Sequence, residues 1–274
     1  HEFPEDQSLI VLDEIHKYAR WRTLVKGFYD LYFPRKNLIV TGSARLDHYR
    51  KGGDSLVGRY HYHRLHPFSV DEFSAHPTSG DVETLLTYGG FPEPLTKQNS
   101  VFLRRWRVER NSRVLREDLR DLETVKEVSL LEALLDAIPD RVGSPFSIRS
   151  LQEDLQVAHE TISRWLVILE NVYLTYRVAP FGASKIRAIK KEQKIYLWDW
   201  TMIDSPGARF ENMTASLLLK FCHFQEDTLG HRMELRYLRD RDGREVDFVV
   251  IRDKKPLFAV ECKLYDTALS PHIV

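Results

Sequence analysis

A strand–helix–strand pattern near the amino end constrains this chain most, because it defines two neighbouring parallel strands. Residues 9–12 form a continuous aliphatic run, which is typical of a buried parallel strand. Residues 19–32 follow with apolar side chains spaced for one face of a helix. A second aliphatic run occupies residues 37–40. This spacing predicts a βαβ unit and an α/β fold, with the carboxyl tips of both strands side by side.

Polar residues stand at both of these expected strand tips. Asp13 and Glu14 directly follow the first run, and Thr41 and Ser43 follow the second. An aliphatic run that ends in two carboxylates is the pattern of a Walker B strand. In a nucleotide hydrolase Asp13 would hold Mg²⁺ through its shell, and Glu14 would polarise the attacking water. Thr41 or Ser43 would sense the terminal phosphate of ATP. Ordinary helix-capping acids after a buried strand are the alternative.

The sequence contains no phosphate-binding loop. Such a loop needs Gly-Lys-Ser or Gly-Lys-Thr, whose lysine and backbone N–H groups cradle phosphate, and neither tripeptide occurs in the 274 residues. The P-loop strand usually precedes Walker B, yet only residues 1–7 precede it here, and there is no initiator methionine. We therefore expect a fragment truncated at both ends, with the P-loop upstream and little ATP binding by these residues alone.

The carboxyl end carries a second pattern of strands and charges. Residues 244–250 and 257–263 predict two apolar strands, and the turn-prone stretch 252–256 joins them as a hairpin. Glu261 and Lys263 project from one face of the second strand, because side chains alternate along a strand.

Asp247 on the first of these strands completes an Asp…Glu-x-Lys arrangement, as in restriction-endonuclease-like nucleases. There Asp247 and Glu261 would hold Mg²⁺, while Lys263 would stabilise negative charge. Glu211, at the start of an expected helix, would add a carboxylate. The alternative is a hairpin with ordinary charged residues on its wet face.

The middle of the chain predicts a winged helix. Helices are expected at residues 148–155, capped by Ser147, and at 159–171. A strand over 173–178 and a basic loop over 185–194 would then form the wing. If this unit reads DNA, four residues would face the groove: His159, Thr161, Ser163 and Arg164. The alternative is a winged helix that serves packing or protein contacts.

Charge gives no further guidance on partners. Lys+Arg and Asp+Glu both total 40, so nucleic acid is neither favoured nor excluded. Arginines recur at every third position in an expected helical stretch, residues 101–127. Such a ridge could grip phosphates, but the neighbouring acids favour a solvated face on which the charges pair.

Two isolated cysteines suit a reducing cytosol, and no signal peptide or membrane-spanning stretch is present. We therefore expect a cytoplasmic protein that does not enter a membrane. A length of 274 residues favours two or three domains.

The order of the motifs resembles bacterial and archaeal AAA-type ATPases that carry a C-terminal domain of unknown function, built from a winged helix and an endonuclease-like fold. The resemblance rests on collinear short motifs at residues 9–17, 41–46, 58–59, 65–73, 89–92, 116–119, 198–199, 210–212 and 245–248. It implies Walker B roles for Asp13 and Glu14 and a sensor role for Ser43. It also makes Arg59 a candidate for sensing γ-phosphate, and action across a subunit boundary would require a homo-oligomer.

The resulting prediction is an α/β chain of four parts. These are a partial P-loop AAA-like domain (1–75), a helical connecting region (76–143), a winged helix (144–195) and a partial restriction-endonuclease-like α/β domain (196–274). We expect an ATPase that acts on DNA, with ATP and Mg²⁺ as cofactors and Asp13, Asp247 and Glu261 as metal ligands. Two alternatives remain: an ATP-dependent switch whose C-terminal region binds a protein partner, and a Mg²⁺-dependent DNA nuclease.

Overall fold

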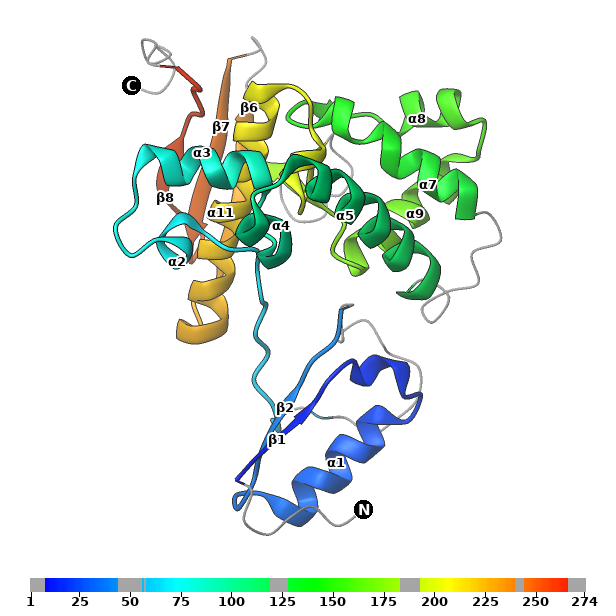
Figure 1. The fold of residues 1–274 in the computed structure, drawn as a ribbon, viewed down its shortest axis with the longest axis vertical. Coiled ribbons are helices and arrows are strands. Elements are labelled where there is room, and N and C mark those ends of the chain that lie inside the picture. The colour runs from blue at the N-terminus through cyan, green and yellow to red at the C-terminus, as the bar shows by residue number, and fades with distance from the viewer. Residues whose placement is uncertain are drawn as a thin grey trace.

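The structure is a computed structural model that describes residues 8–43, 56, 58–118, 128–182, 193–239 and 244–265. Its amino-terminal unit comprises β1 (Leu9–Leu12), a short 3₁₀ turn (Ile15–Lys17), α1 (Trp21–Tyr32) and β2 (Asn37–Val40). β1 and β2 pair in parallel, which confirms the predicted βαβ unit. Figure 1 shows this unit below the rest of the described chain, with an extended segment leading up from it.

The two faces of the β1–β2 pair differ in burial: one carries a buried side chain and the other is exposed. Ile10 of β1 is buried, as are Trp21 and Phe28 on the apolar stripe of α1. Val11 and Ile39 are register partners on the opposite face, where about half of each side chain is exposed. The sequence alternation therefore buries one face of this sheet and leaves an apolar face open.

Helices follow the extended segment, and local capping fixes where they begin. They are α2 (Val70–Phe73), α3 (Ser79–Tyr88), α4 (Pro92–Lys97) and α5 (Ser100–Arg113), which continues into a π-helical turn (Val114–Asp118). Thr78 and Asp81 form a capping box at α3. Asn99 accepts a hydrogen bond from the Phe102 N–H, 2.9 Å away, at the start of α5. These side chains satisfy backbone N–H groups that the first helical turn leaves unpaired.

The next part contains the predicted pair of helices. Its elements are α7 (Val128–Ala137), a 3₁₀ turn (Pro139–Arg141), β3 (Pro145–Phe146), α8 (Ile148–Leu155), α9 (His159–Asn171), β4 (Thr175–Pro180) and β5 (Gln193–Leu197). α8 and α9 confirm the predicted helices, and they bury Leu151, Ile162 and Leu166. Ser147 occupies the N-cap position of α8, as predicted, but its side chain makes no capping hydrogen bond.

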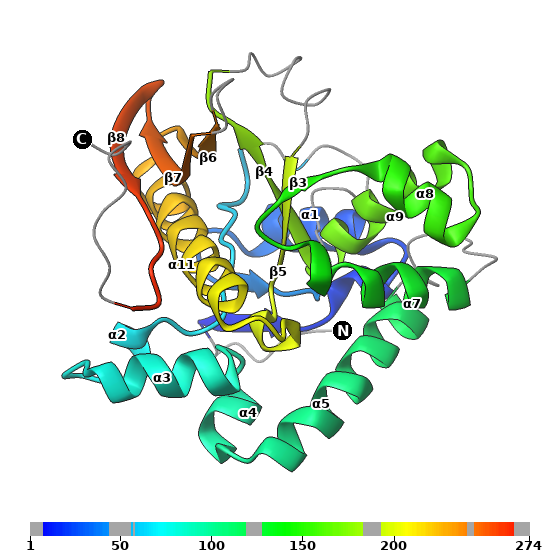
Figure 2. The same cartoon turned by 90° about the horizontal axis from the view of Figure 1, so that it is seen from above.

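A long helix and three strands complete the described fold. After a 3₁₀ turn (Trp200–Met202) come α11 (Pro206–Leu229), β6 (Met233–Arg239), β7 (Glu245–Arg252) and β8 (Lys255–Val260). β7 and β8 pair antiparallel, which confirms the predicted hairpin. Asp253 and Lys254 form its turn with positive φ angles of 50° and 71°. The expected extent of the second strand is wrong: β8 ends at Val260, so Glu261 and Lys263 lie beyond it and not on one of its faces. Figure 2 shows α11 lying along the strands β5 to β7.

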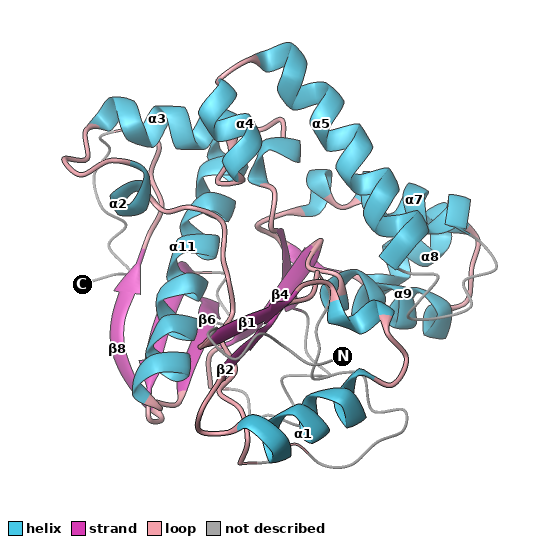
Figure 3. Ribbon diagram, turned by 60° about the horizontal axis from the view of Figure 1, so that its bottom comes forward, coloured by secondary structure: helices cyan, strands magenta, loops and turns pink. Residues whose placement is uncertain are grey.

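The strands of these last two parts form one sheet. Among the described residues its order is β3-β5-β4-β6-β7-β8, and all neighbours are antiparallel except β4 and β6, which are parallel. Figure 3 shows β4 and β6 between α11 and α9, with β8 on the other side of α11. The core contains Trp165, Tyr196, Trp200 and Phe248. The sheet therefore runs without a break past the boundary expected at residues 195/196.

Candidate functional site

The tips of β1 and β2 bring four sequence-predicted polar residues together. The Thr41 hydroxyl donates a hydrogen bond to the Asp13 carboxylate. The Ser43 hydroxyl donates to Glu14 Oε2 over 3.2 Å. Backbone pairing fixes this proximity, because Thr41 N donates to Leu12 O at 2.9 Å and Ile15 N donates to Thr41 O at 3.0 Å. The parallel ladder thus carries each carboxylate to a hydroxyl on the neighbouring strand.

Glu14 adopts an unusual backbone conformation at this site. Its φ of 50° and ψ of 39° lie in the left-handed region, which costs a non-glycine residue about 1 kcal/mol or more. Its carboxylate lies 3.5 Å from the Nδ1 of His16, whose side chain is buried, and 3.9 Å from the Nζ of Lys17. Such strain is common where a side chain must be aimed at a reacting group. His16 was not singled out from the sequence, where it carries no spacing signal.

Arg59 lies beside α1. Its guanidinium is 3.6 Å from a carboxylate oxygen of Asp30 and 5.9 Å from the ring centre of Tyr29. Both partners belong to α1. The role of Arg59 as a γ-phosphate sensor stays a prediction.

The carboxyl-terminal candidates also gather, at one end of the large sheet. Asp247 accepts a hydrogen bond from Cys262 N at 2.7 Å, and Lys263 Nζ lies 2.6 Å from Glu261 Oε1. Glu211 accepts a hydrogen bond from the Tyr196 hydroxyl at 2.8 Å. Burial raises the pKa of Glu211, and the nearby Asp247 charge raises it further, against the opposing effect of Lys194.

The structure places Lys194 in the strand β5 and not in the predicted loop of the wing. The sequence placed it at the end of the basic loop 185–194, whose residues 185–192 lie outside the described part of the chain. Instead of facing solvent, its side chain is 1% exposed and forms ion pairs with Glu211, at 3.1 Å, and with Glu245. Burial lowers the pKa of Lys194, but these two carboxylates outweigh it and the net pKa lies above the usual value. The two partners of Lys194 come from distant parts of the sequence, so the residues around Lys194 give no sign that it is buried and paired.

No metal cluster is formed by the described residues. Within ranges 8–43, 56, 58–118, 128–182, 193–239 and 244–265, no group of three or more His, Cys, Asp or Glu side chains is arranged to hold an ion. Asp247 and Glu261, two of the expected ligands, instead have the partners in the protein given above. Their role as metal ligands stays a prediction.

The proposed DNA-contacting residues lie along α9. His159 and Arg164 are exposed, whereas Thr161 and Ser163 are half-buried. The Ser163 hydroxyl donates to the carbonyl oxygen of His159 over 2.9 Å, so it is partly engaged within its own helix. His159 and Arg164 are therefore the better placed of the four for contact with a partner.

The regularly spaced arginines form the expected solvated face only in part. Arg104, Arg113 and Arg116 are exposed, and Arg116 pairs with Glu132 at 3.6 Å. Two others have different partners. Arg107 donates to the carbonyl oxygen of Thr201 at 2.5 Å. Arg110 lies over the Phe91 ring, 4.3 Å from its centre. Both therefore serve contacts inside the fold, where arginine can pack its planar group as well as pair its charge.

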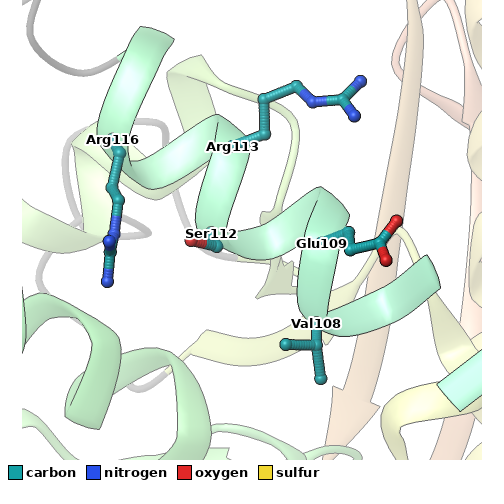
Figure 4. A pocket seen from close by; sticks show the side chains of 5 residues that line it. All are labelled: Val108, Glu109, Ser112, Arg113 and Arg116. Atoms are coloured by element: carbon teal, nitrogen blue, oxygen red, sulfur yellow. The ribbon is translucent and has the colours of Figure 1, made fainter. Parts of the chain in front are cut away.

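A shallow hollow of about 450 Å³ lies farther along α5, lined by Val108, Glu109, Ser112, Arg113 and Arg116. In Figure 4 these side chains point in different directions. They do not converge as the groups of a ligand site do.

A junction that the sequence did not reveal ties residues 64–68 to α11. Arg64 pairs with Glu226 at 2.7 Å and with Asp227 at 2.6 Å. His66 Nε2 lies 2.8 Å from His223 Nδ1. The motif at residues 65–73 thus has a structural role, holding the extended segment against the long helix. A basic residue in that segment and an acidic pair in α11 were the available signal.

Comparison with protein families divides the chain into three. Residues 1–74 match a family described as an AAA domain. Residues 79–204 match a domain of unknown function, DUF8612, and residues 206–271 match another, DUF4143. The amino-terminal part is therefore similar to AAA-type, nucleotide-binding ATPases, which confirms that part of the resemblance. The winged-helix and endonuclease-like assignments stay predictions.

Similar curated proteins are themselves uncharacterised. One from Haemophilus influenzae is 23% identical over 280 residues, covering 93% of this chain and 65% of that protein. One from Mycobacterium tuberculosis is 23% identical over 192 residues, 70% of this chain and 43% of that protein. One from Methanocaldococcus jannaschii is 23% identical over 269 residues, 80% and 55% respectively. The matches thus cover between 43% and 65% of the length of these relatives.

No solved structure matches the chain significantly. Among the described residues, every helix is too short or too polar to cross a membrane.

Proposed function

We propose that residues 8–43 form the hydrolytic half of an AAA-type ATP site. The observation that carries this proposal is the pair of hydrogen bonds at the carboxyl ends of two parallel strands, from Thr41 to Asp13 and from Ser43 to Glu14. Ligands of open α/β sheets bind at this end of the strands. The match of residues 1–74 to an AAA domain supports the same assignment.

The donor atoms at the strand tips suit Mg²⁺. Asp13 offers an exposed carboxylate and Thr41 a hydroxyl, and Mg²⁺ prefers such oxygen ligands, usually taking one or two carboxylates together with substrate phosphates. When bound with ATP, Mg²⁺ neutralises charge on the phosphate oxygens. The phosphate-cradling Gly-Lys-Ser/Thr is not in this sequence. The proposal therefore concerns the half of the site that positions metal and water.

Glu14 is the residue that would orient the attacking water. Its left-handed backbone turns the carboxylate out of the strand direction, and the Ser43 hydroxyl holds one oxygen. Ser43 would also couple the state of the terminal phosphate to β2, because it touches the group that acts on the water.

Substitution of Glu14 tests this proposal in the intact protein. Glu14→Gln should lower ATP hydrolysis by about 100-fold or more, because a positioned general base contributes that much. Binding of a fluorescent ATP analogue should be retained. Glu83→Gln, an exposed carboxylate change on α3, is the matched control and should hydrolyse ATP like the wild type. Equal hydrolysis by Glu14→Gln and wild type would refute the proposal.

We infer a second function, DNA contact by α9, from its exposed amino-terminal residues. His159 and Arg164 are exposed on a helix that packs its apolar face onto α8 and β4. The strand order β3-β5-β4 beside these helices supports a winged-helix arrangement. An arginine at such a position pairs readily with phosphate. A protein partner on the same surface remains the alternative.

DNA binding by the intact protein can be measured by fluorescence anisotropy with duplex DNA. Affinity should fall as salt rises, and Arg164→Ala should weaken binding by about tenfold. Arg232→Ala, which removes an exposed arginine just before β6, should leave affinity unchanged. If Arg164→Ala binds DNA like the wild type, the DNA assignment fails and the protein-partner alternative gains.

A further inference from the structure

An acidic cluster at one end of the large sheet encloses a single buried ammonium group. Lys194 of β5 pairs with Glu211 from α11 and with Glu245 from β7, and its side chain is 1% exposed. The Tyr237 ring lies on a further side, with its centre 5.5 Å from Nζ. Asp247 lies near enough for its charge to act on Glu211. Residues from three elements, α11, β6 and β7, therefore surround one cation carried by β5.

The carboxylate of Glu211 has little room for another ligand. Its Oε1 accepts hydrogen bonds from Lys194 and from the Tyr196 hydroxyl. Its Oε2 lies against Gly143, where a Cβ would stand only 2.8 Å away. Gly143 also has a φ of 79°, so a side chain there would be strained as well as obstructed. The close backbone approach closes this side of the carboxylate.

Two neighbouring carboxylates have protein partners on at least one oxygen. Asp247 accepts from Cys262 N, and Glu261 Oε1 is held by Lys263, the residue that the nuclease pattern would use in chemistry. Among the described residues, the buried Glu261 Oε2 has no hydrogen-bond partner. Mg²⁺ requires about six oxygen ligands in near-octahedral geometry. A divalent ion placed here would also face the Lys194 ammonium, and like charges repel strongly where water is excluded. The residues present therefore do not fit the metal that an endonuclease-like fold implies.

From these observations we propose that Lys194 is the resident cation of the Glu211–Glu245–Asp247 cluster, in the place where a nuclease of this fold would bind a divalent metal. The cluster then stabilises the fold without a bound metal, and it is not a site of DNA cleavage. Lys194 comes from β5, outside the Asp…Glu-x-Lys strands, so it is supplied by the preceding part of the chain. The inference is independent of the ATP site proposed above.

Manganese binding to the intact wild-type protein tests the proposal directly. Electron paramagnetic resonance is recorded without nucleotide. The amount of bound Mn²⁺ should be the same in the wild type and in Asp247→Asn. DNA incubated with Mg²⁺ should remain uncut in both proteins. A bound Mn²⁺ that is lost in Asp247→Asn, or Mg²⁺-dependent cleavage that is lost in the same variant, would overturn the proposal. These measurements need no change to Lys194.

Removing the ammonium supplies the complementary test. Lys194→Met should lower the melting temperature by about 10 °C, because buried carboxylates lose their partner. Added Mn²⁺ should recover part of that loss while leaving the wild type unchanged. Lys255→Met is the matched control: this lysine is exposed at the start of β8, so the loss should be small and insensitive to Mn²⁺. A Lys194→Met protein with the same melting temperature as the wild type would contradict the assignment of Lys194 as the resident cation.

Discussion

His66 shows, at the scale of a residue, how burial sets the charge state of one side chain. It packs edge-on against Trp198, with ring centres 4.9 Å apart, and contacts His223. Desolvation, together with the positive charges of Lys220 and Arg64, lowers the pKa of His66 to about 4. The ring is therefore neutral at neutral pH, although its position in the sequence suggests nothing unusual.

This pKa makes stability depend on pH. Because the folded pKa lies below the unfolded value of 6.5, the neutral ring stabilises the fold above pH 6.5, and this contribution is lost as pH falls towards 4. Between pH 7 and 5 the wild type should lose about 2 kcal/mol more free energy of unfolding than His66→Gln. Urea titrations at both pH values measure this difference. His63→Gln, which changes an exposed histidine, should keep the wild-type pH dependence; if it does not, another group is responsible.

Glycines at the turn between α3 and α4 decide how elements approach one another. A Cβ on Gly90 would stand 2.8 Å from each of three neighbours: the carbonyl oxygen of Phe68, the Cβ of Pro67 and the ring of Trp200. Phe68 N also donates to the carbonyl oxygen of Gly90 at 2.7 Å. The extended segment, the glycine turn and the 3₁₀ turn at Trp200 thus meet where a side chain has no space.

Gly90→Ala should therefore force these elements apart. We expect a loss of about 2 kcal/mol in the free energy of unfolding, the usual cost of overpacking a tight contact. Gly80→Ala provides the control, since its nearest neighbour is 3.6 Å away and alanine favours the α3 helix. Thermal unfolding compares the two variants. A Gly90→Ala protein as stable as Gly80→Ala would show that the junction adapts at no cost.

At the scale of the whole molecule, residues 58–68 connect the amino-terminal unit to the part of the chain that contains the large sheet. Figure 1 shows this segment running from the β1–β2 unit to α11. Arg64 fixes it to the carboxyl end of α11 by pairing with Glu226 and Asp227. The hydroxyl of Tyr62 in the same segment lies 2.9 Å from that of Tyr173, which attaches the segment to the middle region as well.

The domain division predicted from sequence treats the chain as separate parts, whereas β4 and β6 join two of them in one sheet. Ala179 pairs with Arg236 across that junction. The buried Lys194 reinforces it, because its partners Glu211 and Glu245 lie beyond the expected boundary at 195/196. Strand pairing between distant segments depends on tertiary contacts that periodicity within each segment does not contain.

Local sequence patterns were sufficient to predict several of the helices and strands. The βαβ unit, α8, α9 and the β7–β8 hairpin follow from aliphatic runs, helical spacing and turn residues, because each is specified by neighbours along the chain. Parallel pairing also made the meeting of Asp13 with Thr41 predictable, since it brings equivalent strand ends to one edge.

Only the tertiary structure decided which charges are buried and with whom they pair. Lys194 belongs by sequence to a basic loop, and Arg107 to a row of regularly spaced arginines, yet both reach partners far along the chain. A charge enters the interior when the fold supplies a matching group there, because an unpaired buried charge is too costly to persist. That match is a property of the assembled sheet and helices, and it is absent from any local stretch of residues.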